Sequence, residues 1–372
     1  MTEQPNNGAM TQPNYDDYGG EIKLVQEVKQ ESCPGCGSVL AFDPEKQALT
    51  CGHCGTRVDV AKLMAQERPL DFNVAGNRRW AADTRVFRCG ACGAETVFQK
   101  TEFAKTCPFC DSTAITTIEN LDGVRPDSVI PFRVTQEKAG QLYSAWAKKR
   151  LMAPKAFRKE HALESMKALY APSWTFDSDT LSFYSGTVGD YYYVTVGSGN
   201  NRRTERRIRY RKVAGQYKMN FDDILINAGA QPDERSFKKV LPFSLKQAAQ
   251  YNESFLAGFH AEHYKKDLSE GYNEARGVID RVVRKSIITS LHCDVVSKLN
   301  INTRYSGETF KYLLLPFYIC THMYKHKAYR FFVNGETGSL TGTAPISSPK
   351  VAIVVAAVLA VLAGIILFAV LI

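Results

Sequence analysis

Eight of the ten cysteines in this chain form two copies of one spaced pattern. In each copy, a Cys-x2-Cys pair is followed after fourteen residues by a second pair, and the copies lie 56 positions apart. Two such pairs joined by a hairpin supply four thiolates to a tetrahedral metal ion. The pattern therefore predicts two closed metal sites of the structural kind. Their ligands are Cys33, Cys36, Cys51 and Cys54 in the first copy and Cys89, Cys92, Cys107 and Cys110 in the second.

Zinc is the metal that we expect at these sites, with two ions, one in each four-cysteine site. Iron also accepts four thiolates, so the ligands alone leave it open. A disulfide framework is disfavoured because such frameworks belong to small secreted chains, and the first eighteen residues contain no apolar signal-peptide core. His53 stands inside a pair that already has its cysteines, and we expect it to be a bystander.

Each four-cysteine segment, which we call a ribbon, is very short. Residues 37–50 and 93–106 are long enough only for a hairpin, so metal binding should supply most of the folding free energy of each ribbon. We expect chelation of the metal to unfold residues 32–58 and 87–115 first.

The other end of the chain predicts a membrane anchor. Residues 351–372 contain no charged or polar side chain, and 22 helical residues span roughly 33 Å, enough for a bilayer core. Lys350 precedes the segment, and the positive-inside tendency leaves residues 1–350 in the cytoplasm. The expected location is the cytoplasmic membrane, with a single pass and a reducing environment for the thiolates. The alternative is a buried core helix.

The expected fold class is α+β, in seven segments. Two small rubredoxin-like or transcription-factor-IIB-type zinc ribbons precede an α+β body with antiparallel strands, and one transmembrane helix follows. The segments are a disordered stretch 1–31, ribbon 32–58, linker 59–86, ribbon 87–119, body 120–345, spacer 346–350 and transmembrane helix 351–372.

The body shows signs of a weak internal duplication. Each half reads as a strand with proline, a helix, a second strand with proline and then a hairpin, beginning at Val129–Phe132 and again at Val240–Phe243. The clearest helix runs from Leu268 to about Leu291, with Asp267 and Glu270 able to cap its start. Its predicted apolar stripe is Leu268, Tyr272, Ala275, Ile279, Val282 and Ile287. The clearest hairpins are Leu181–Gly197 and Arg330–Leu340.

Much of the net charge of +9 gathers in one segment. Seven cations less Glu205 give +6 within residues 202–212: Arg202, Arg203, Arg206, Arg207, Arg209, Arg211 and Lys212. This basic segment could bind anionic lipid headgroups or nucleic-acid phosphates, or it could be a solvated strand face. We favour lipid over nucleic acid because an anchored chain meets the membrane at high local concentration.

The sequence gives no positive argument for an enzyme. It has no Gly-x4-Gly-Lys-Ser/Thr loop for nucleotide phosphates. His260 and His263 lack the spacing that places two ligands on one helical face. The acidic pairs Asp177 with Asp179 and Asp222 with Asp223 are common on turns. Cys293 and Cys320 have no doublet partners, and we expect inert core thiols.

Together these residues resemble a family of bacterial membrane-anchored proteins with paired transcription-factor-IIB-type zinc ribbons, often labelled primosomal protein N′ or helicase-like. The likeness covers residues 30–345 and rests on the cysteine turns CPGCG, CGHCG, CGACG and CPFCD with seven further segments. These are Val129–Phe132, Tyr170–Trp174, Gly189–Tyr193, Leu256–Phe259, Asn302–Tyr305, Leu314–Phe317 and Val333–Gly338. The helicase label is not supported, because the ATPase motifs are absent.

Some relatives are similar to components of phage-shock-type envelope-stress systems. The resemblance implies a membrane adaptor that works with a second membrane protein, a flotillin-like SPFH protein and an ESCRT-III-like coat protein. Our hypothesis is a non-enzymatic adaptor that recruits cytosolic partners to the bilayer. A membrane-tethered nucleic-acid-binding protein is the rival.

Overall fold

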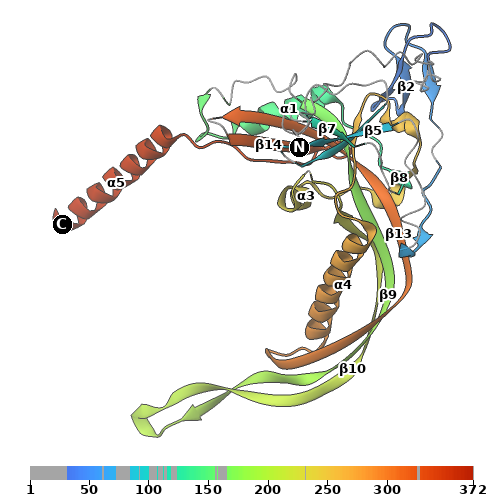
Figure 1. The fold of residues 1–372 in the computed structure, drawn as a ribbon. Helices are drawn as coiled ribbons and strands as arrows, with labels where there is room; N and C mark the ends of the chain where they lie inside the picture. Colours follow the sequence, from blue (N-terminus) through green and yellow to red (C-terminus); the bar gives the residue numbers. More distant parts are fainter. Residues whose placement is uncertain are drawn as a thin grey trace, which may run out of the picture.

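The protein is a mixed α+β structure that consists mostly of sheet (Figure 1). The computed structural model describes residues 32–60, 63–72, 84–91, 93–99, 107, 112, 115–118, 124–155, 157, 166–230, 232–324 and 327–371. The predicted disordered segment 1–31 and two of the predicted ligands, Cys92 and Cys110, lie outside these residues.

The described strands form two sheets. The small sheet is antiparallel and contains β1 (Leu40–Asp43), β2 (Ala48–Cys51) and β3 (Arg57–Asp59). The large sheet contains β4 (Arg68–Pro69), β5 (Thr84–Cys89), β6 (Glu95–Gln99), β7 (Ile115–Ile118), β8 (Ser128–Val129), β9 (Met166–Val196), β10 (Arg203–Asn227), β11 (Ala249–Gln250), β12 (His260–Glu262), β13 (Val295–Tyr324), β14 (Lys327–Asn334) and β15 (Leu340–Gly342).

The described α-helices are α1 (Gln136–Lys148), α3 (Glu234–Val240), α4 (Leu268–Ser290) and α5 (Ser348–Leu371). Short 3₁₀ turns are η2 (Gly199–Asn201), η3 (Leu245–Gln247) and η4 (Glu253–Leu256). Figure 1 shows the long strands β9, β10 and β13 curving together, with α4 on their inner side.

The antiparallel pair β9 and β13 forms the spine of the body. Its register runs from Gly189 opposite Val295 to Met166 opposite Cys320. Aromatic and β-branched residues make up nearly half of both strands, as expected for a pleated surface that is covered. The core gathers near the start of β9 and in the second half of β13, where Tyr170 and Trp174 of β9 are fully buried with large rings from neighbouring elements.

The order of short strand, helix, long strand and strand occurs twice, as β8-α1-β9-β10 and as β12-α4-β13-β14. Each short strand pairs in parallel with the long strand of the other run, since Val129 lies opposite Leu314 and Ala261 opposite Tyr170. The two runs are therefore interlocked. Val240–Phe243, expected to open the second run, is not a strand: α3 ends at Val240, and β12 takes that place.

Helix α4 begins at Leu268, as expected from its capping residues. The Asp267 carboxylate accepts a hydrogen bond from the Glu270 backbone N–H (2.8 Å). The Glu270 carboxylate accepts one from the Asp267 backbone N–H (3.1 Å), which completes a capping box. One position of the predicted stripe is wrong. Val282 is 37% exposed, whereas its neighbour Val283 is buried against Phe221 of β10.

The predicted hairpins differ in extent. The predicted hairpin at 181–197 is wrong, because residues 181–196 are the outer part of one long strand, β9, and the return strand is β10, which holds residues 203–212 of the basic segment. The turn between β14 and β15 is confirmed: the Gly338 N–H donates to the Asn334 carbonyl (2.9 Å), with a φ of 78° at Gly338. Cys320 is a buried core thiol, as predicted, but Cys293 is only half-buried because it lies in the connection after α4.

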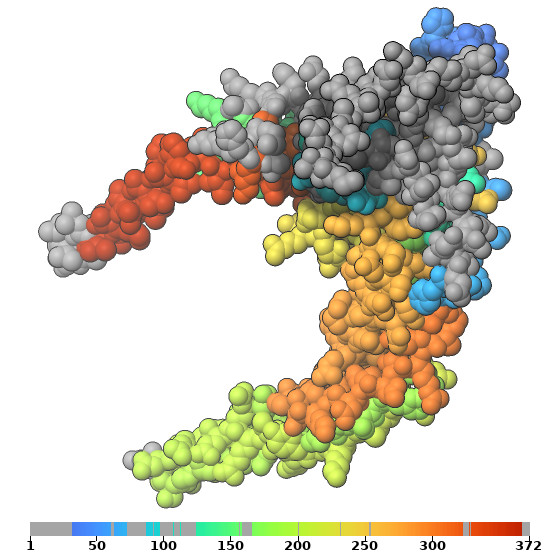
Figure 2. All heavy atoms as spheres, in the orientation of Figure 1, coloured from blue at the N-terminus to red at the C-terminus, as the bar shows by residue number. Residues whose placement is uncertain are grey.

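Helix α5 is long and apolar enough to cross a membrane, and residues Ser348–Ile366 have a mean hydropathy of 2.5 with no side chain buried in the body. The helix begins inside the predicted spacer 346–350. Its base is attached to the loop after α1. The Ser347 N–H donates to the Met152 carbonyl (2.9 Å), and Lys350 Nζ donates to the Leu151 carbonyl (2.9 Å). Figures 1 and 2 show α5 projecting away from the body.

Candidate metal centre

The first two cysteine pairs adopt the same backbone turn. The Cys33 N–H donates to the Ser38 carbonyl (2.7 Å), and the Gly37 N–H donates back to the Cys33 carbonyl (2.8 Å). The turn at Cys51 repeats this pattern with bonds of 2.9 and 3.0 Å. Gly37 and Gly55 have φ values of 73° and 75°, which a residue with a Cβ rarely adopts. These turns point both sulfurs of a pair toward one centre.

The four sulfurs of the first set come together. The Sγ atoms of Cys33 and Cys54 lie 3.4 Å apart, and those of Cys36 and Cys51 lie 3.5 Å apart. All four atoms lie within 4.8 Å of one another. Thiolates held at about 2.3 Å from a tetrahedral ion are about 3.8 Å from each other. This set of four cysteines could therefore bind a metal ion.

Electrostatics at these sulfurs also favour a cation. The Thr56 hydroxyl is the largest of several contacts that lower the pKa of Cys33 to about 6. The pKa of Cys36 is raised to about 12: the Ser38 backbone N–H lowers it, but the sulfur of Cys54, burial and further sulfur neighbours together outweigh that contact. Without a bound ion, the neighbouring sulfurs thus oppose the ionisation of Cys36. A divalent cation removes this conflict, because it binds thiolates and releases their protons.

The first ribbon is docked on the body by its own small sheet. Phe42 of β1 is buried, with ring centroids 5.4 Å from Phe255 and 6.5 Å from Phe259. Its N–H donates to the Ala257 carbonyl (3.1 Å), and Gln47 Nε2 donates to the Phe132 carbonyl (2.5 Å). The four-sulfur cluster is thus seated at the edge of the main core. His53 lies on the exposed side of its turn.

The second set repeats the same local backbone where the structure describes it. The Cys89 N–H donates to the Ala94 carbonyl (2.9 Å), and the Gly93 N–H donates to the Cys89 carbonyl (2.9 Å). Gly93 has a φ of 71°. The Cys107 N–H donates to the Ser112 carbonyl (2.8 Å). Cys89 and Cys107 are both buried. Unlike the first ribbon, this hairpin joins the large sheet, because β6 pairs with β12.

The predicted basic segment lies on the outer half of the β9–β10 hairpin. Apart from Arg202, which follows η2 in the turn, its residues belong to β10 and pair with residues 187–196 of β9. The structure therefore places the basic segment on a projecting ribbon, far along the curved sheet from the metal centre (Figure 1). It does not bring the two candidate sites together.

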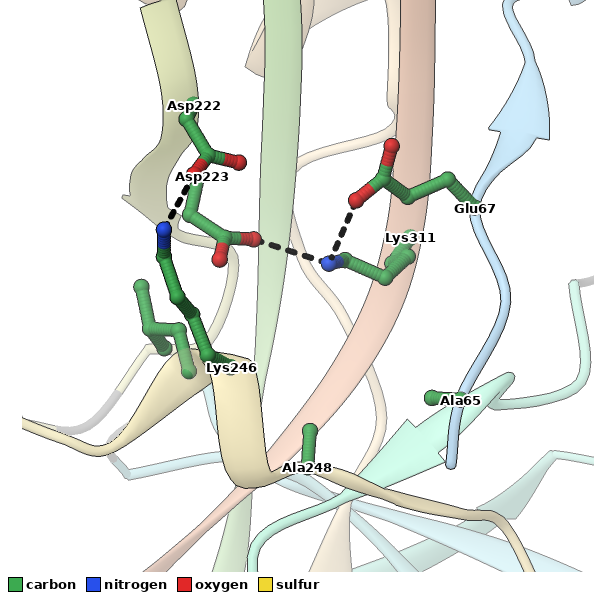
Figure 3. Close-up of a pocket in the computed structure, with 8 residues that line it drawn as sticks. Ala65, Glu67, Asp222, Asp223, Lys246, Ala248 and Lys311 are labelled. Carbon is green, nitrogen blue, oxygen red and sulfur yellow. Dashed lines mark hydrogen bonds and ion pairs between the residues drawn. The ribbon is translucent and has the colours of Figure 1, made fainter. Parts of the chain in front are cut away.

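One charged cluster could not be recognised as a unit in the sequence (Figure 3). Four carboxylates from three separate segments meet beside two lysines, at the edge of a cavity of about 230 Å³. The sequence shows the acidic pairs Asp177 with Asp179 and Asp222 with Asp223. No sequence pattern connects these pairs to Glu67 in the segment between the two cysteine ribbons. The cluster consists of Glu67, Asp177, Asp222, Asp223, Lys246 and Lys311.

Lys311 is the centre of this cluster. Its Nζ lies 2.9 Å from Asp223 and 3.2 Å from Glu67, and the side chains of Lys311 and Asp223 are each only 8% exposed. Burial disfavours the cation, but the two carboxylates outweigh it and raise the pKa of Lys311. The ammonium group thus contacts two of the four carboxylates. The cluster therefore fastens the inter-ribbon segment to the sheet.

His263, which follows the short strand of the second run, packs in the interior. His263 is buried, stacks on Tyr264 with centroids 4.3 Å apart, and places Nδ1 3.4 Å from Glu95. Burial is the main cause that lowers its pKa. The histidines do not join the group of four cysteines or the group of four carboxylates, which are the candidate ligand groups among the described residues.

The chain is similar to a protein of Bacillus subtilis (strain 168) that bears the name "Uncharacterized protein YdjG". The two are 27% identical over 326 residues, which cover 86% of this chain and 91% of that protein. No family model matches the chain, and no solved structure matches it.

Proposed function

We propose that this protein is a non-enzymatic, membrane-anchored adaptor whose metal-bound ribbons present a rigid surface to cytosolic protein partners. The observation that carries the proposal is the combination, in one chain, of a closed four-sulfur cluster with an exposed apolar helix long enough to span a bilayer. A site with four protein ligands has no open position for a substrate, which favours a structural role.

The proposed metal is zinc, with one ion in each ribbon. For the second site, support comes from the turn at Cys89, which reproduces the hydrogen bonds and the positive φ of the first ribbon. Cys92 and Cys110 are the proposed remaining ligands there, beside Cys89 and Cys107. Metal analysis of purified protein tests this: two zinc ions per chain are expected, and one ion or iron would overturn this part.

The proposed orientation places the ribbons in the cytoplasm, with α5 in the cytoplasmic membrane. Eight thiolates require a reducing compartment, and Lys350 stands at the base of α5, as the positive-inside tendency expects. Anchoring raises the effective concentration of any recruited protein at the bilayer. By resemblance, the proposed partners are a second membrane protein, a flotillin-like SPFH protein and an ESCRT-III-like coat protein, in an envelope-stress response.

Crosslinking on intact membranes, followed by affinity purification in detergent, tests the adaptor role. We expect membrane and cytosolic coat-type proteins to be crosslinked to residues 32–60. The variant Cys36→Ser with Cys54→Ser should lose these crosslinks but remain in the membrane, whereas Cys293→Ser should keep them. Recovery of nucleic-acid machinery alone would overturn the proposal and favour the nucleic-acid-binding rival.

A further inference from the structure

The outer end of the β9–β10 hairpin extends beyond the rest of the sheet. β13 accompanies β9 only as far as Gly189, which lies opposite Val295. In the described residues 166–230 and 232–324, no third strand pairs with the hairpin beyond that point. A two-stranded ribbon by itself is marginally stable in water. The outer end of the hairpin is therefore suited to contact with another molecule or with a membrane surface.

The pairing register sorts the basic segment onto two faces. Residues that lie opposite each other point to the same side, and the side alternates along each strand. Arg206 lies opposite Tyr193, and Ile208 lies opposite Tyr191. We call this side the tyrosine face, and it consists of Tyr191, Tyr193, Arg206, Ile208, Tyr210 and Lys212.

The opposite side, which we call the arginine face, is half neutralised by its own acids, since its four arginines share it with Glu205 and Asp190. It carries Arg203, Glu205, Arg207, Arg209 and Arg211 of β10. Arg203 and Arg207 both pair with Glu205, at 2.9 and 3.4 Å. Arg211 pairs with Asp190 (3.1 Å) and also donates to the Leu291 carbonyl at the end of α4. Most cations on this face are therefore engaged within the protein.

The tyrosine face combines exposed rings with uncompensated charge. Tyr193 is 68% exposed and Tyr210 is 55% exposed. Arg206 stacks over the Tyr191 ring, with its guanidinium carbon 4.3 Å from the ring centre. None of the residues that alternate onto this face between positions 187–195 and 204–212 is acidic. Exposed tyrosines beside cations are typical of surfaces that lie at the level of lipid headgroups.

Tyr210 lies close to the backbone of the opposite strand. Gly189 is its cross-strand partner, and a Cβ on that glycine would stand 3.2 Å from the Tyr210 ring and 2.5 Å from the side chain of Ile208. The missing Cβ leaves room for the ring to cover the strand. The base of the hairpin is also attached, because the Tyr191 N–H donates to the Asp294 carboxylate (2.7 Å). The base of the tyrosine face is therefore attached to the body.

The base of the anchor carries the same mixture of groups. Residues 148–152 read Lys-Lys-Arg-Leu-Met, and the loop is hydrogen-bonded to the start of α5 through Ser347 and Lys350. Leu151 is 68% exposed, and Ile346 is 69% exposed. Cations with exposed apolar side chains thus stand at the place where α5 would enter a bilayer. The chain repeats this chemistry at the end of the hairpin.

Figure 1 shows α5 and the β9–β10 hairpin projecting toward the same side of the body, from opposite ends of the curved sheet. Figure 2 shows the hollow between these two arms, bordered by α4. A bilayer that α5 enters therefore lies on the side to which the hairpin points.

We propose that the tyrosine face binds the anionic headgroups of the bilayer that α5 spans, as a second membrane contact of the chain. The inference rests on the anchor of the proposed function and not on its metal ribbons. Arg206 and Lys212 would contact phosphate groups, and Tyr193 and Tyr210 would lie among the headgroups. Two contacts at the ends of the curved sheet would hold the body in one orientation toward the membrane.

Hydrogen–deuterium exchange of the full chain in nanodiscs tests the contact. Nanodiscs of phosphatidylcholine alone are compared with nanodiscs that also contain phosphatidylglycerol. Each cation near an anionic surface is worth about a 5-fold change in binding. We therefore expect residues 190–209 to exchange up to about 25-fold more slowly in the anionic nanodiscs. Exchange in α4 should be equal in both and reports that the body is folded.

A matched pair of variants separates the faces, since both remove two charges from the same ribbon. Arg206→Gln with Lys212→Gln should abolish the lipid-dependent slowing. Arg207→Gln with Arg209→Gln should leave it within about 2-fold of the native chain, because those residues lie on the arginine face. Tyr193→Ser with Tyr210→Ser should also reduce the slowing. An equal loss in both charge pairs would overturn the assignment to the tyrosine face.

The remaining outcomes also decide the question. No slowing in a chain that resists alkaline extraction would overturn the contact and leave the anchor intact. Protection of residues 190–209 by a single-stranded oligonucleotide, but not by anionic lipid, would assign the face to nucleic acid. Extraction of the native chain by alkali would overturn the anchor instead. Binding of that extracted chain to phosphatidylglycerol vesicles would then decide the hairpin separately.

Discussion

The two cysteine ribbons have the same local turns but very different surroundings. The first is a separate three-stranded sheet whose buried Leu40, Phe42 and Leu49 join the main core, while its strands pair only with each other in the described residues. The second extends the large sheet through β6 and β12, and Cys89 belongs to a hydrophobic cluster that includes Leu169 of β9. One pattern of cysteines is thus used once as a docked module and once as a part of the body.

The difference indicates where the metal matters most. A docked ribbon whose strands do not pair with the large sheet relies more on the ion for its order. A ribbon whose strands continue into a large sheet has backbone hydrogen bonds and burial to hold it as well. The ribbons were expected to unfold together when the metal is removed. The structure instead favours a graded response, in which the first ribbon unfolds and the second largely remains.

Removal of metal ligands should give the largest effect. Cys36→Ser with Cys54→Ser removes two of four thiolates, and structural zinc sites contribute about 10 kcal/mol of apparent binding free energy. We expect residues 32–60 to lose exchange protection, while β5 and β6 keep theirs. Hydrogen exchange with metal analysis measures this, and Cys293→Ser is the control. Equal loss in both ribbons would contradict the comparison.

Docking of the first ribbon should depend on one ring. Phe42→Ala empties a site between Phe255 and Phe259 and should lower the free energy of unfolding by about 3–5 kcal/mol. Phe72→Ala is the matched control, because Phe72 is 46% exposed and contacts Tyr272 at the surface. Its cost should stay within about 0.5 kcal/mol. Similar costs in denaturant titrations of the two variants would show that the ribbon is not docked through Phe42.

The segment between the ribbons should depend on Lys311. Lys311→Met leaves the buried Asp223 without its cation and should cost about 3–5 kcal/mol. Lys246→Met removes a lysine that is 81% exposed and pairs with Asp222 at 2.8 Å. That change should cost about 1 kcal/mol or less. Thermal unfolding compares the two variants, and a larger effect at Lys246 would contradict the role of Lys311.

Acid should weaken this attachment by a small amount. A hydrogen bond from Asp177 and the Lys311 cation lower the pKa of Glu67. The resulting stability is present above the unfolded pKa of about 4.3 and is lost as the pH falls through the lower folded value. Asp177 acts in the opposite sense, since burial raises its pKa. Glu67→Gln should reduce the acid-dependent loss by about 1 kcal/mol or less in titrations between about pH 3 and 5. A steeper loss in that variant would reverse the assignment.

Local patterns in the sequence predicted much of the fold. The start of α4 followed from Asp267 and Glu270, because a capping box involves residues three positions apart. The four sulfurs of the first ribbon followed from spacing within about twenty residues. The exchange of Val282 for Val283 on the buried side of α4 shows the limit of such reasoning. Strands on either side of the helix decide which of two adjacent valines is covered.

Long-range arrangements were beyond the sequence. The cluster around Lys311 joins residues from the inter-ribbon segment, β9, β10 and β13, and no spacing rule connects these positions. The two faces of the basic hairpin also required the register, because a shift of one residue would place Arg206 on the other side. Val240–Phe243 resembles Val129–Phe132 in sequence, which predicts a strand there. The structure instead ends α3 at Val240 and places the short strand of the second run at β12.

The interlocking of β8 with β13 and of β12 with β9 has a consequence for how the chain is made. Synthesis begins at the N-terminus, so Ser128 emerges long before Leu313, the residue that will lie opposite it. Until then the edges of β8 and β9 remain open to other chains, which is a known source of misassembly. Such distant pairings also slow folding. A nascent chain of this protein is therefore expected to need protection by chaperones until β13 has left the ribosome.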